Sequence, residues 1–313
     1  MKSLFACLVA AAALLVTAPA QAMEGVVASI KPVHSLVAAV MKGVGAPVLI
    51  VQGGASPHGY ALRPSDAQAL QDARLVIWIG PALETFLEEP LGTLAADATV
   101  IRLDEAPGVT LLQVREGGAF QADEHDHEHR NEHDGHDHDG PFNPHLWLDP
   151  QNARAIVGAA AAALAKLDPD NADRYRANAA ALAVRLEELE KEIAKTLAPV
   201  RDRPFVVYHD AFQYFESRFG LTAAGSVTVS PDTPPGAARI GEIREKIMEL
   251  GAVCVFTEPQ FAPKIVDVTI EGTGARAGVL DPLGAELENG PDLYFTLLTN
   301  LAASLRRCLS GTG

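Results

Sequence analysis

Histidine is the residue type in this sequence with the most evident chemistry. Six of the ten histidines lie in one acidic stretch, namely His125, His127, His129, His133, His136 and His138. The other four are His34, His58, His145 and His209. Zn(II) accepts three imidazole nitrogens and one carboxylate in a tetrahedral site. The sequence therefore indicates binding of a transition metal, at a preformed site, in the acidic stretch, or at both.

A preformed site needs elements that bring distant ligands together. His58, His209 and Asp281 each come shortly after a short apolar run that is typical of a strand, and His145 stands where the acidic stretch rejoins ordered chain. In open β/α folds, ligands bind outside the carboxyl ends of the strands. Convergence of His58, His145, His209 and Asp281 on one Zn(II) site is therefore one hypothesis. Spacing alone does not show it, and a structural role is the alternative for each histidine taken singly.

Other polar residues near these positions have competing explanations. His34 lies near the start of a predicted helix at 32–41, and we expect a structural role for it. A ligating imidazole usually donates its second N–H group to an acceptor. Asp149, Asp210 and Glu258 are candidates for that acceptor, and a helix cap or a turn is the alternative for each.

The acidic stretch is predicted to be a long mobile loop over 113–143. It is poor in apolar residues, and its histidines alternate with Asp and Glu, so it offers many interchangeable metal ligands. Each ligand of a mobile loop must be immobilised on binding, so these sites should be weaker or less selective than a preformed one. The alternative is a solvated acidic run with no metal.

Short β-rich runs alternate with helical patterns on both sides of this loop. The predicted strands are 26–30, 47–51, 74–79, 99–103, 205–208, 224–229, 253–257 and 277–280. The predicted helices are 32–41, one that opens with a capping box at 65–68, 81–96, 149–167, 169–197, 211–219, 235–250, 262–269 and 291–309. Such alternation predicts an α/β fold in which mostly parallel sheets are flanked by helices.

One helical pattern is longer than the rest. It runs from Pro169 to Leu197, with Asp168 as its expected cap and Pro199 as its stop, and a helix of that length would measure about 45 Å. We expect a rigid spine between two lobes. The predicted organisation is a signal peptide at 1–22, an N-terminal β/α lobe at 23–167, a linking helix at 168–203 and a C-terminal β/α lobe at 204–313.

Composition and the N-terminus narrow the class of protein. With 48% apolar residues in 313, the chain is globular rather than disordered, and a net charge of -15 argues against binding to nucleic acid or to an anionic membrane. The N-terminus has an apolar run at 4–16 followed by small residues at Ala20 and Ala22, which is typical of a secretory signal peptide. We expect export, with a mature chain that begins near Met23.

Cysteine usage agrees with export. Cys7 lies inside the apolar run and should be removed with the signal peptide. Cys254 and Cys308 then remain, and an even pair in an exported protein is most simply a disulfide.

Several of these segments together carry a resemblance to a known family. They are Gly54–Tyr60, Leu62–Asp66, Asn143–Pro150, Val207–Phe215, Thr257–Phe261 and Val279–Gly284, in that order and with a His-rich insertion between the second and the third. In these motifs the chain resembles the ZnuA-type zinc-binding proteins of periplasmic ABC importers, which belong to the metal-specific (cluster A) solute-binding proteins. The resemblance covers essentially the whole mature chain.

The resemblance implies a fold and a set of ligands. It implies two β/α lobes bridged by a long rigid helix, with the metal between them and with His58, His145 and His209 as ligands. Asp281 matches the carboxylate position, which water or another carboxylate can fill in zinc-specific relatives. Pro57 stands where some relatives carry an acidic residue. Manganese-binding relatives tend to have a carboxylate at the position of His209, so histidine there indicates zinc.

The resemblance also implies a function without catalysis. The protein would capture Zn(II) in the periplasm and deliver it to an ABC permease in the inner membrane, as a monomer, and a periplasmic zinc chaperone could be a further partner. The pair Cys254 and Cys308 resembles a disulfide of zinc-binding members, and the insertion resembles theirs, with implied roles in capture, handover or sensing of metal.

Two other functions compete with import. A zinc hydrolase would need an open coordination position and a general base, for which Glu258 or Asp210 could be considered. A metal buffer would act through the loop alone, with several weak sites.

Overall fold

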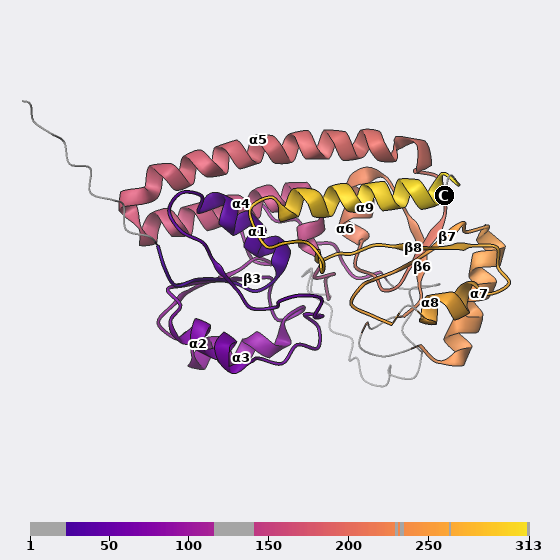
Figure 1. The fold of residues 1–313 in the computed structure, drawn as a ribbon, viewed down its shortest axis with the longest axis horizontal. Helices are drawn as coiled ribbons and strands as arrows, with labels where there is room; N and C mark the ends of the chain where they lie inside the picture. The colour runs from indigo at the N-terminus through magenta and orange to yellow at the C-terminus, as the bar shows by residue number, and fades with distance from the viewer. Residues whose placement is uncertain (1–22, 116–140, 229–230, 232–234, 263, 312–313) are drawn as a thin grey trace, which may run out of the picture.

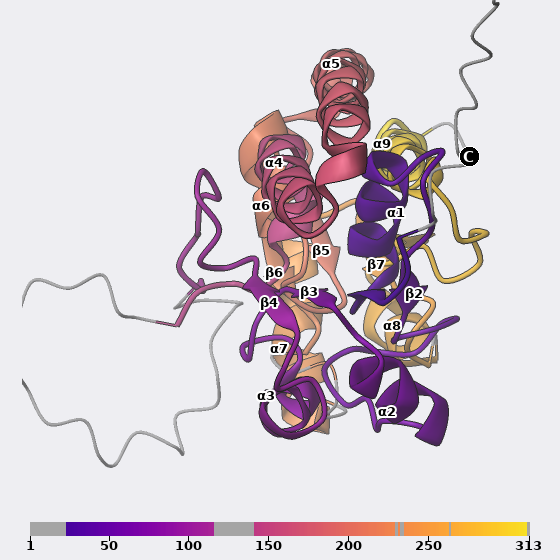
Figure 2. The ribbon, with the colours of Figure 1, turned by 90° about the vertical axis from the view of Figure 1, so that its left-hand side faces the viewer.

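The computed structural model describes residues 23–115, 141–228, 231, 235–262 and 264–311. The N-terminal part is built on four parallel strands, which are β1 (Val26–Ala28), β2 (Val48–Leu49), β3 (Leu75–Trp78) and β4 (Thr99–Arg102), in the order β2-β1-β3-β4. Strands β1 and β3 are buried along their whole length, as expected for apolar strands covered on both faces. Helices α1 (Lys31–Val40) and α4 (Pro150–Leu167) lie on one side of this sheet, and α2 (Pro64–Gln71) and α3 (Thr85–Thr93) lie on the other (Figures 1 and 2).

The C-terminal part repeats this plan without a sequence repeat. Its strands are β5 (Phe205–Val207), β6 (Ala223–Ser226), β7 (Cys254–Thr257) and β8 (Arg276–Val279), parallel and in the order β6-β5-β7-β8. Its helices are α6 (Gln213–Phe219), α7 (Ala237–Leu250), α8 (Lys264–Ile270) and α9 (Leu293–Leu309). The predicted α/β fold with two sheets flanked by helices is confirmed.

The predicted spine is helix α5 (Ala172–Leu197), which has 26 residues. It buries Leu182, Leu186, Leu189 and Ile193, whose spacing of three or four residues puts them on one face. This face packs on α4 and α1 at one end and on α9 at the other, so α5 runs along both parts of the molecule (Figure 1).

Two helices begin at other residues than predicted, because the hydrogen bonds at their N-termini differ from the expected caps. Pro169–Asn171 form a 3-10 turn rather than the first turn of α5, and the Asp168 carboxylate accepts hydrogen bonds from Asn171 and Tyr175 side chains instead of capping the helix. The expected capping box at 65–68 is also shifted, because Asp66 accepts the backbone N–H of Arg63.

The predicted disulfide is present and joins Cys254 at the start of β7 to Cys308 near the end of α9. The predicted signal peptide and the six loop histidines, His125, His127, His129, His133, His136 and His138, lie outside the described residues. Among the helices in the described ranges, none combines the length and apolar character that a membrane crossing requires.

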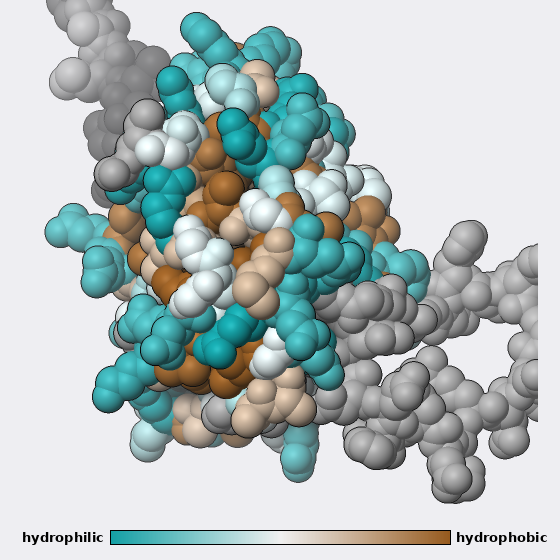
Figure 3. All heavy atoms as spheres, turned by 90° about the vertical axis from the view of Figure 1, so that its right-hand side faces the viewer, coloured by the Kyte–Doolittle hydropathy of each residue, from teal (hydrophilic) through white to brown (hydrophobic). Residues whose placement is uncertain are grey.

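The outer end of the C-terminal part carries α7 and α8. Viewed from this end, hydrophilic residues surround smaller groups of hydrophobic ones (Figure 3). The exposed apolar residues of these two helices include Met248, Leu250 and Val268. The surface of this end is therefore mixed in polarity rather than uniformly charged.

Candidate metal centre

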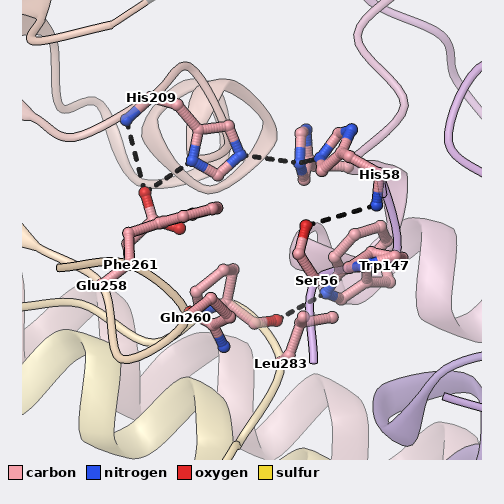
Figure 4. Close-up of a pocket in the computed structure, with 11 residues that line it drawn as sticks. Ser56, His58, Trp147, His209, Glu258, Gln260, Phe261 and Leu283 are labelled. Carbon is pink, nitrogen blue, oxygen red and sulfur yellow. Dashed lines mark hydrogen bonds and ion pairs between the residues drawn. The ribbon is translucent and has the colours of Figure 1, made fainter. Parts of the chain in front are cut away.

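Three histidines from distant segments meet between the two sheets. His58 comes from the loop between β2 and α2, His145 directly precedes the 3-10 turn Leu146–Leu148, and His209 follows β5 by two residues. The Nε2 atom of His145 lies 3.2 Å from the Nε2 atom of His58 and 3.2 Å from that of His209. One ligand nitrogen from each ring lies within 4.8 Å of the other two. Figure 4 shows His58 and His209 facing the same small space.

The spacing of these nitrogens suits a tetrahedral metal ion. Two ligands at about 2.0–2.1 Å from zinc with tetrahedral angles stand roughly 3.3 Å apart. The observed 3.2 Å agrees with that value. Within the described ranges, these histidines form a group of ligand residues close enough to hold one ion.

Hydrogen bonds at the other ring nitrogen prepare two of the histidines for a cation. Nδ1–H of His145 donates to Oδ1 of Asn143 at 2.8 Å, and Nδ1–H of His209 donates to Oε1 of Glu258 at 2.6 Å. Both acceptors hold a proton on Nδ1, so that in the neutral ring the lone pair lies on Nε2. Two lone pairs that face each other at 3.2 Å repel unless a cation lies between them. The arrangement is therefore built for a positive ion.

Burial keeps the site in its metal-binding protonation state. His145 and His209 are each 4% exposed. Burial lowers the pKa of His58 to about 3 and that of His145 well below its usual value, and repulsion from His209 in its protonated form is the second cause. These two imidazoles are thus neutral at physiological pH and need not lose a proton to bind metal. Trp147 and Phe261 provide apolar walls (Figure 4).

Asp281, expected as the carboxylate ligand, lies outside this histidine cluster. Its Oδ1 accepts the backbone N–H groups of Leu283 and Gly284 and the side-chain amide of Gln260, and its Oδ2 accepts the N–H of Ala285. Because the residue follows β8 at the start of a tight loop, the nearest donors are that loop's own N–H groups. The carboxylate organises the loop in this conformation.

Of the three candidate acceptors for a ligating imidazole, Glu258 contacts one of the histidines, and the other two have different partners. Glu258 contacts His209, whereas Asp149 caps α4 and pairs with Arg218, and Asp210 pairs with Arg115. For Asp149 and Asp210 the structural explanations therefore apply.

One acceptor was missed at the level of sequence. Asn143 holds both the backbone N–H and the ring of His145, and a signal existed in the two-residue spacing of Asn143-Pro-His145. His34 lies in α1, where its Nε2 is 3.0 Å from the carbonyl of Pro47, in agreement with a structural role.

Comparison with known families decides the relationship. The family model described as zinc-uptake complex component A, periplasmic (ZnuA), matches residues 26–308. The chain belongs to the ZnuA family.

Individual ZnuA proteins are similar over nearly the whole length. The high-affinity zinc uptake system protein ZnuA of Brucella suis biovar 1 is 51% identical over 309 residues, with 92% of each chain covered. A crystal structure of ZnuA superimposes with a TM-score of 0.75 at 26% identity and covers 91% of this chain and 98% of that one. A ZnuA deletion mutant with zinc bound gives a TM-score of 0.74 at 26% identity, covering 92% and 98%.

Proposed function

We propose that the chain captures Zn(II) in the periplasm and delivers it to an ABC permease for import, with His58, His145 and His209 as its protein ligands. The observation that carries this proposal is the approach of the Nε2 atoms of His145 and His209 to 3.2 Å in a buried site, with the Nδ1 atom of each ring held by an acceptor. Membership of a family of periplasmic zinc-uptake proteins supports zinc as the cargo.

The donor set favours zinc over harder ions. Three imidazole nitrogens suit Zn(II), whereas manganese and magnesium prefer sites rich in oxygen. Asp281 could act as a fourth ligand only by giving up the amide of Gln260 and three backbone N–H groups. We therefore propose that water completes the coordination in the conformation seen here.

The same contacts argue against a hydrolase. A water on the zinc would need a free general base beside it. Oε1 of Glu258 accepts Nδ1–H of His209, so this acid orients a proposed ligand, and Asp210 pairs with the guanidinium of Arg115. We propose a binding protein without catalytic activity that works as a monomer.

The remaining parts of the proposal rest on sequence. The loop at 113–143, with His125, His127, His129, His133, His136 and His138, would hold additional zinc weakly and pass it on to the buried site or exchange it with a periplasmic chaperone. The segment 1–22 would direct export and be removed.

A competitive zinc titration tests this function. The metal-stripped mature chain is titrated beside a variant that lacks Gly117–Gly140. One tight site that survives the deletion, with loss of weaker sites, is the expected result. Loss of the tight site together with the loop would contradict the histidine assignment and would favour a metal buffer that acts through the loop.

A further inference from the structure

The described residues at the two ends of the His-rich insertion, 112–115 and 141–143, are joined by hydrogen bonds and contact the C-terminal lobe. These residues are called the root of the insertion, and its two segments are called the arms. The backbone N–H of Val114 donates to the carbonyl of Pro141 at 3.1 Å, and that of Asn143 donates to Leu112 at 2.8 Å. Tyr214 of α6 accepts the N–H of Leu112 at 3.0 Å and donates to the carbonyl of Asn143 at 2.8 Å. The hydroxyl of buried Tyr214 therefore forms hydrogen bonds with both arms of the root.

Arg115 is the last residue of the first arm, and its guanidinium reaches across to two carboxylates of the other lobe. Its Nε donates to Oδ2 of Asp210 at 2.9 Å, and its two Nη atoms donate to the oxygens of Glu216 at 2.8 and 3.0 Å. The side chain of Arg115 is 19% exposed and that of Glu216 only 4%. Partly buried, charge-assisted hydrogen bonds of this kind are stronger than exposed ion pairs.

From Asp210 the contacts continue to two of the metal-site histidines. Asp210 directly follows His209, and its backbone carbonyl accepts the side-chain amide of Asn143 at 2.6 Å. The other end of that amide, Oδ1, accepts the ring N–H of His145. Arg115 is therefore linked to His209 through Asp210, the next residue in the chain, and to His145 through Asp210 and then Asn143.

These contacts cross the boundary between the N-terminal and C-terminal lobes, which is called the seam. His58 and His145 belong to the N-terminal side of this boundary, and His209 belongs to the C-terminal side, so a metal held by all three would join the two sides. Arg115 lies in the insertion that follows the N-terminal sheet, and it pairs on the C-terminal side with Asp210, three residues before α6, and with Glu216 in the middle of α6.

We propose that Arg115 is a positioning residue that latches the two lobes around the metal and slows its release. The proposal rests on the proposed function, because it presumes that the three histidines bind zinc.

A second arginine provides a matched comparison. Arg218 lies on α6 and forms an ion pair with Asp149 across the same seam. Its Nε donates to Oδ1 at 2.8 Å, and one Nη donates to Oδ2 at 2.7 Å. Asp149 caps α4 and contacts neither ligand histidine in the described structure. Arg176, which pairs with Asp173 on the exposed face of α5, lies away from the seam.

The test is the rate of zinc release from the full mature chain loaded with one equivalent of zinc and mixed with excess chelator. Arg115→Ala is expected to release zinc about tenfold faster with a nearly unchanged association rate, because loss of a closing contact acts on dissociation. Arg176→Ala should stay within about twofold of wild type. Arg218→Ala should speed release less than Arg115→Ala.

Two further measurements separate a latch from a general loss of structure. Arg115→Ala leaves Glu216 buried without its partner, so Arg115→Ala combined with Glu216→Gln removes that charge and should show the same faster release in a stably folded chain. In metal-free protein, the ring nitrogen signals of His145 and His209 in NMR spectra should shift in Arg115→Ala and stay in place in Arg218→Ala.

The outcomes separate the latch from the function beneath it. Unchanged release in the folded double variant, or equal acceleration by Arg218→Ala with no shift of the histidine signals, would overturn the latch while leaving zinc binding intact. If the wild-type chain itself bound no zinc at the buried site, the proposed function would fail and the latch with it.

Discussion

The carboxyl edges of the two sheets follow the same plan and have different uses. Both sheets have the same strand order, and in both the last strand is followed two residues later by an aspartate, Asp104 after β4 and Asp281 after β8. At the N-terminal edge, Glu84 folds back and accepts the N–H groups of Ile79 and Gly80. At the C-terminal edge, the carboxylate of Glu258 is turned to the ring of His209.

This difference shows how one topology supports a closed edge and an open one. Glu84 is fully buried and serves the backbone at the end of β3, so this part of the N-terminal edge, here called the closed edge, offers no ligand to the cleft. Glu258 is equally buried, but it serves an imidazole whose other nitrogen faces the cleft. The acid alone does not mark a site. A site is indicated by the group that the acid orients, here an imidazole. Each prediction below alters one of the two edges.

Removing the imidazole at the open edge should have the largest effect. His209→Ala deletes one of three proposed ligands, so the affinity for the first zinc should fall by at least about 10³-fold, more than the roughly 10–100-fold typical of losing an outer partner. Competitive titration with a chelator of known affinity measures this. His34→Gln is the control, because His34 contacts the carbonyl of Pro47 and should leave zinc affinity unchanged. Wild-type affinity in His209→Ala would remove His209 from the site.

The open edge also lies in the lobe that carries the covalent cross-link. Cys254 and Cys308 are separated by 54 residues, and closure of such a loop stabilises a fold by about 4 kcal/mol in the chain-entropy model. The double variant Cys254→Ala/Cys308→Ala should lose a stability of that order in urea unfolding, with zinc affinity much less affected. A variant as stable as wild type would mean that the C-terminal lobe needs no such support.

At the closed edge, the buried acid should make stability depend on pH. Burial raises the pKa of Glu84 from 4.5 to about 7. Between these values the folded chain holds a proton that the unfolded chain has lost, so the contribution is complete below pH 4.5 and disappears as pH rises through 7. The predicted loss is about 3 kcal/mol.

The comparison of wild type with Glu84→Gln isolates this effect. Urea unfolding of metal-free protein at pH 5 and at pH 8 should show a fall in wild-type stability that is smaller in Glu84→Gln by about that amount. Parallel pH profiles for the two proteins would show that Glu84 is charged in the folded state, against this prediction.

Sequence patterns predicted the strands and helices of both lobes better than the contacts of individual polar side chains. Alternating β-rich and helical runs located all the strands described above, because short β-rich runs between helical patterns leave a clear local signal. The convergence of His58, His145 and His209 also followed, since each lies near the carboxyl end of a strand or at a loop junction. Helix ends were less accurate, as at Pro169–Asn171, where proline can start either a 3-10 turn or an α-helix.

The orientation of carboxylates could not be predicted in the same way. Asp281 has the residue type and the position expected of a ligand, but its oxygens are taken by backbone N–H groups of the next residues. Asn143 has no charge and was not among the candidate acceptors, although it orients His145. Which donor a side chain meets depends on loop geometry within a few ångströms, and that geometry has no periodic pattern in the sequence.

The smallest effect is expected from exchanging the acid itself for an amide at the open edge. Glu258→Gln can still accept Nδ1–H of His209 and keep its tautomer, but it loses the negative charge that makes the imidazole a stronger ligand. Zinc affinity should fall by about tenfold, the lower part of the range for outer partners of ligating histidines. Glu84→Gln makes the same chemical change at the closed edge and should leave zinc affinity as it is, which competitive titrations of both variants at pH 7 would measure. Equal losses in the two variants would mean that both edges affect the metal only through the general stability of the fold, whereas a loss confined to Glu258→Gln ties affinity to the one carboxylate that faces a ligand.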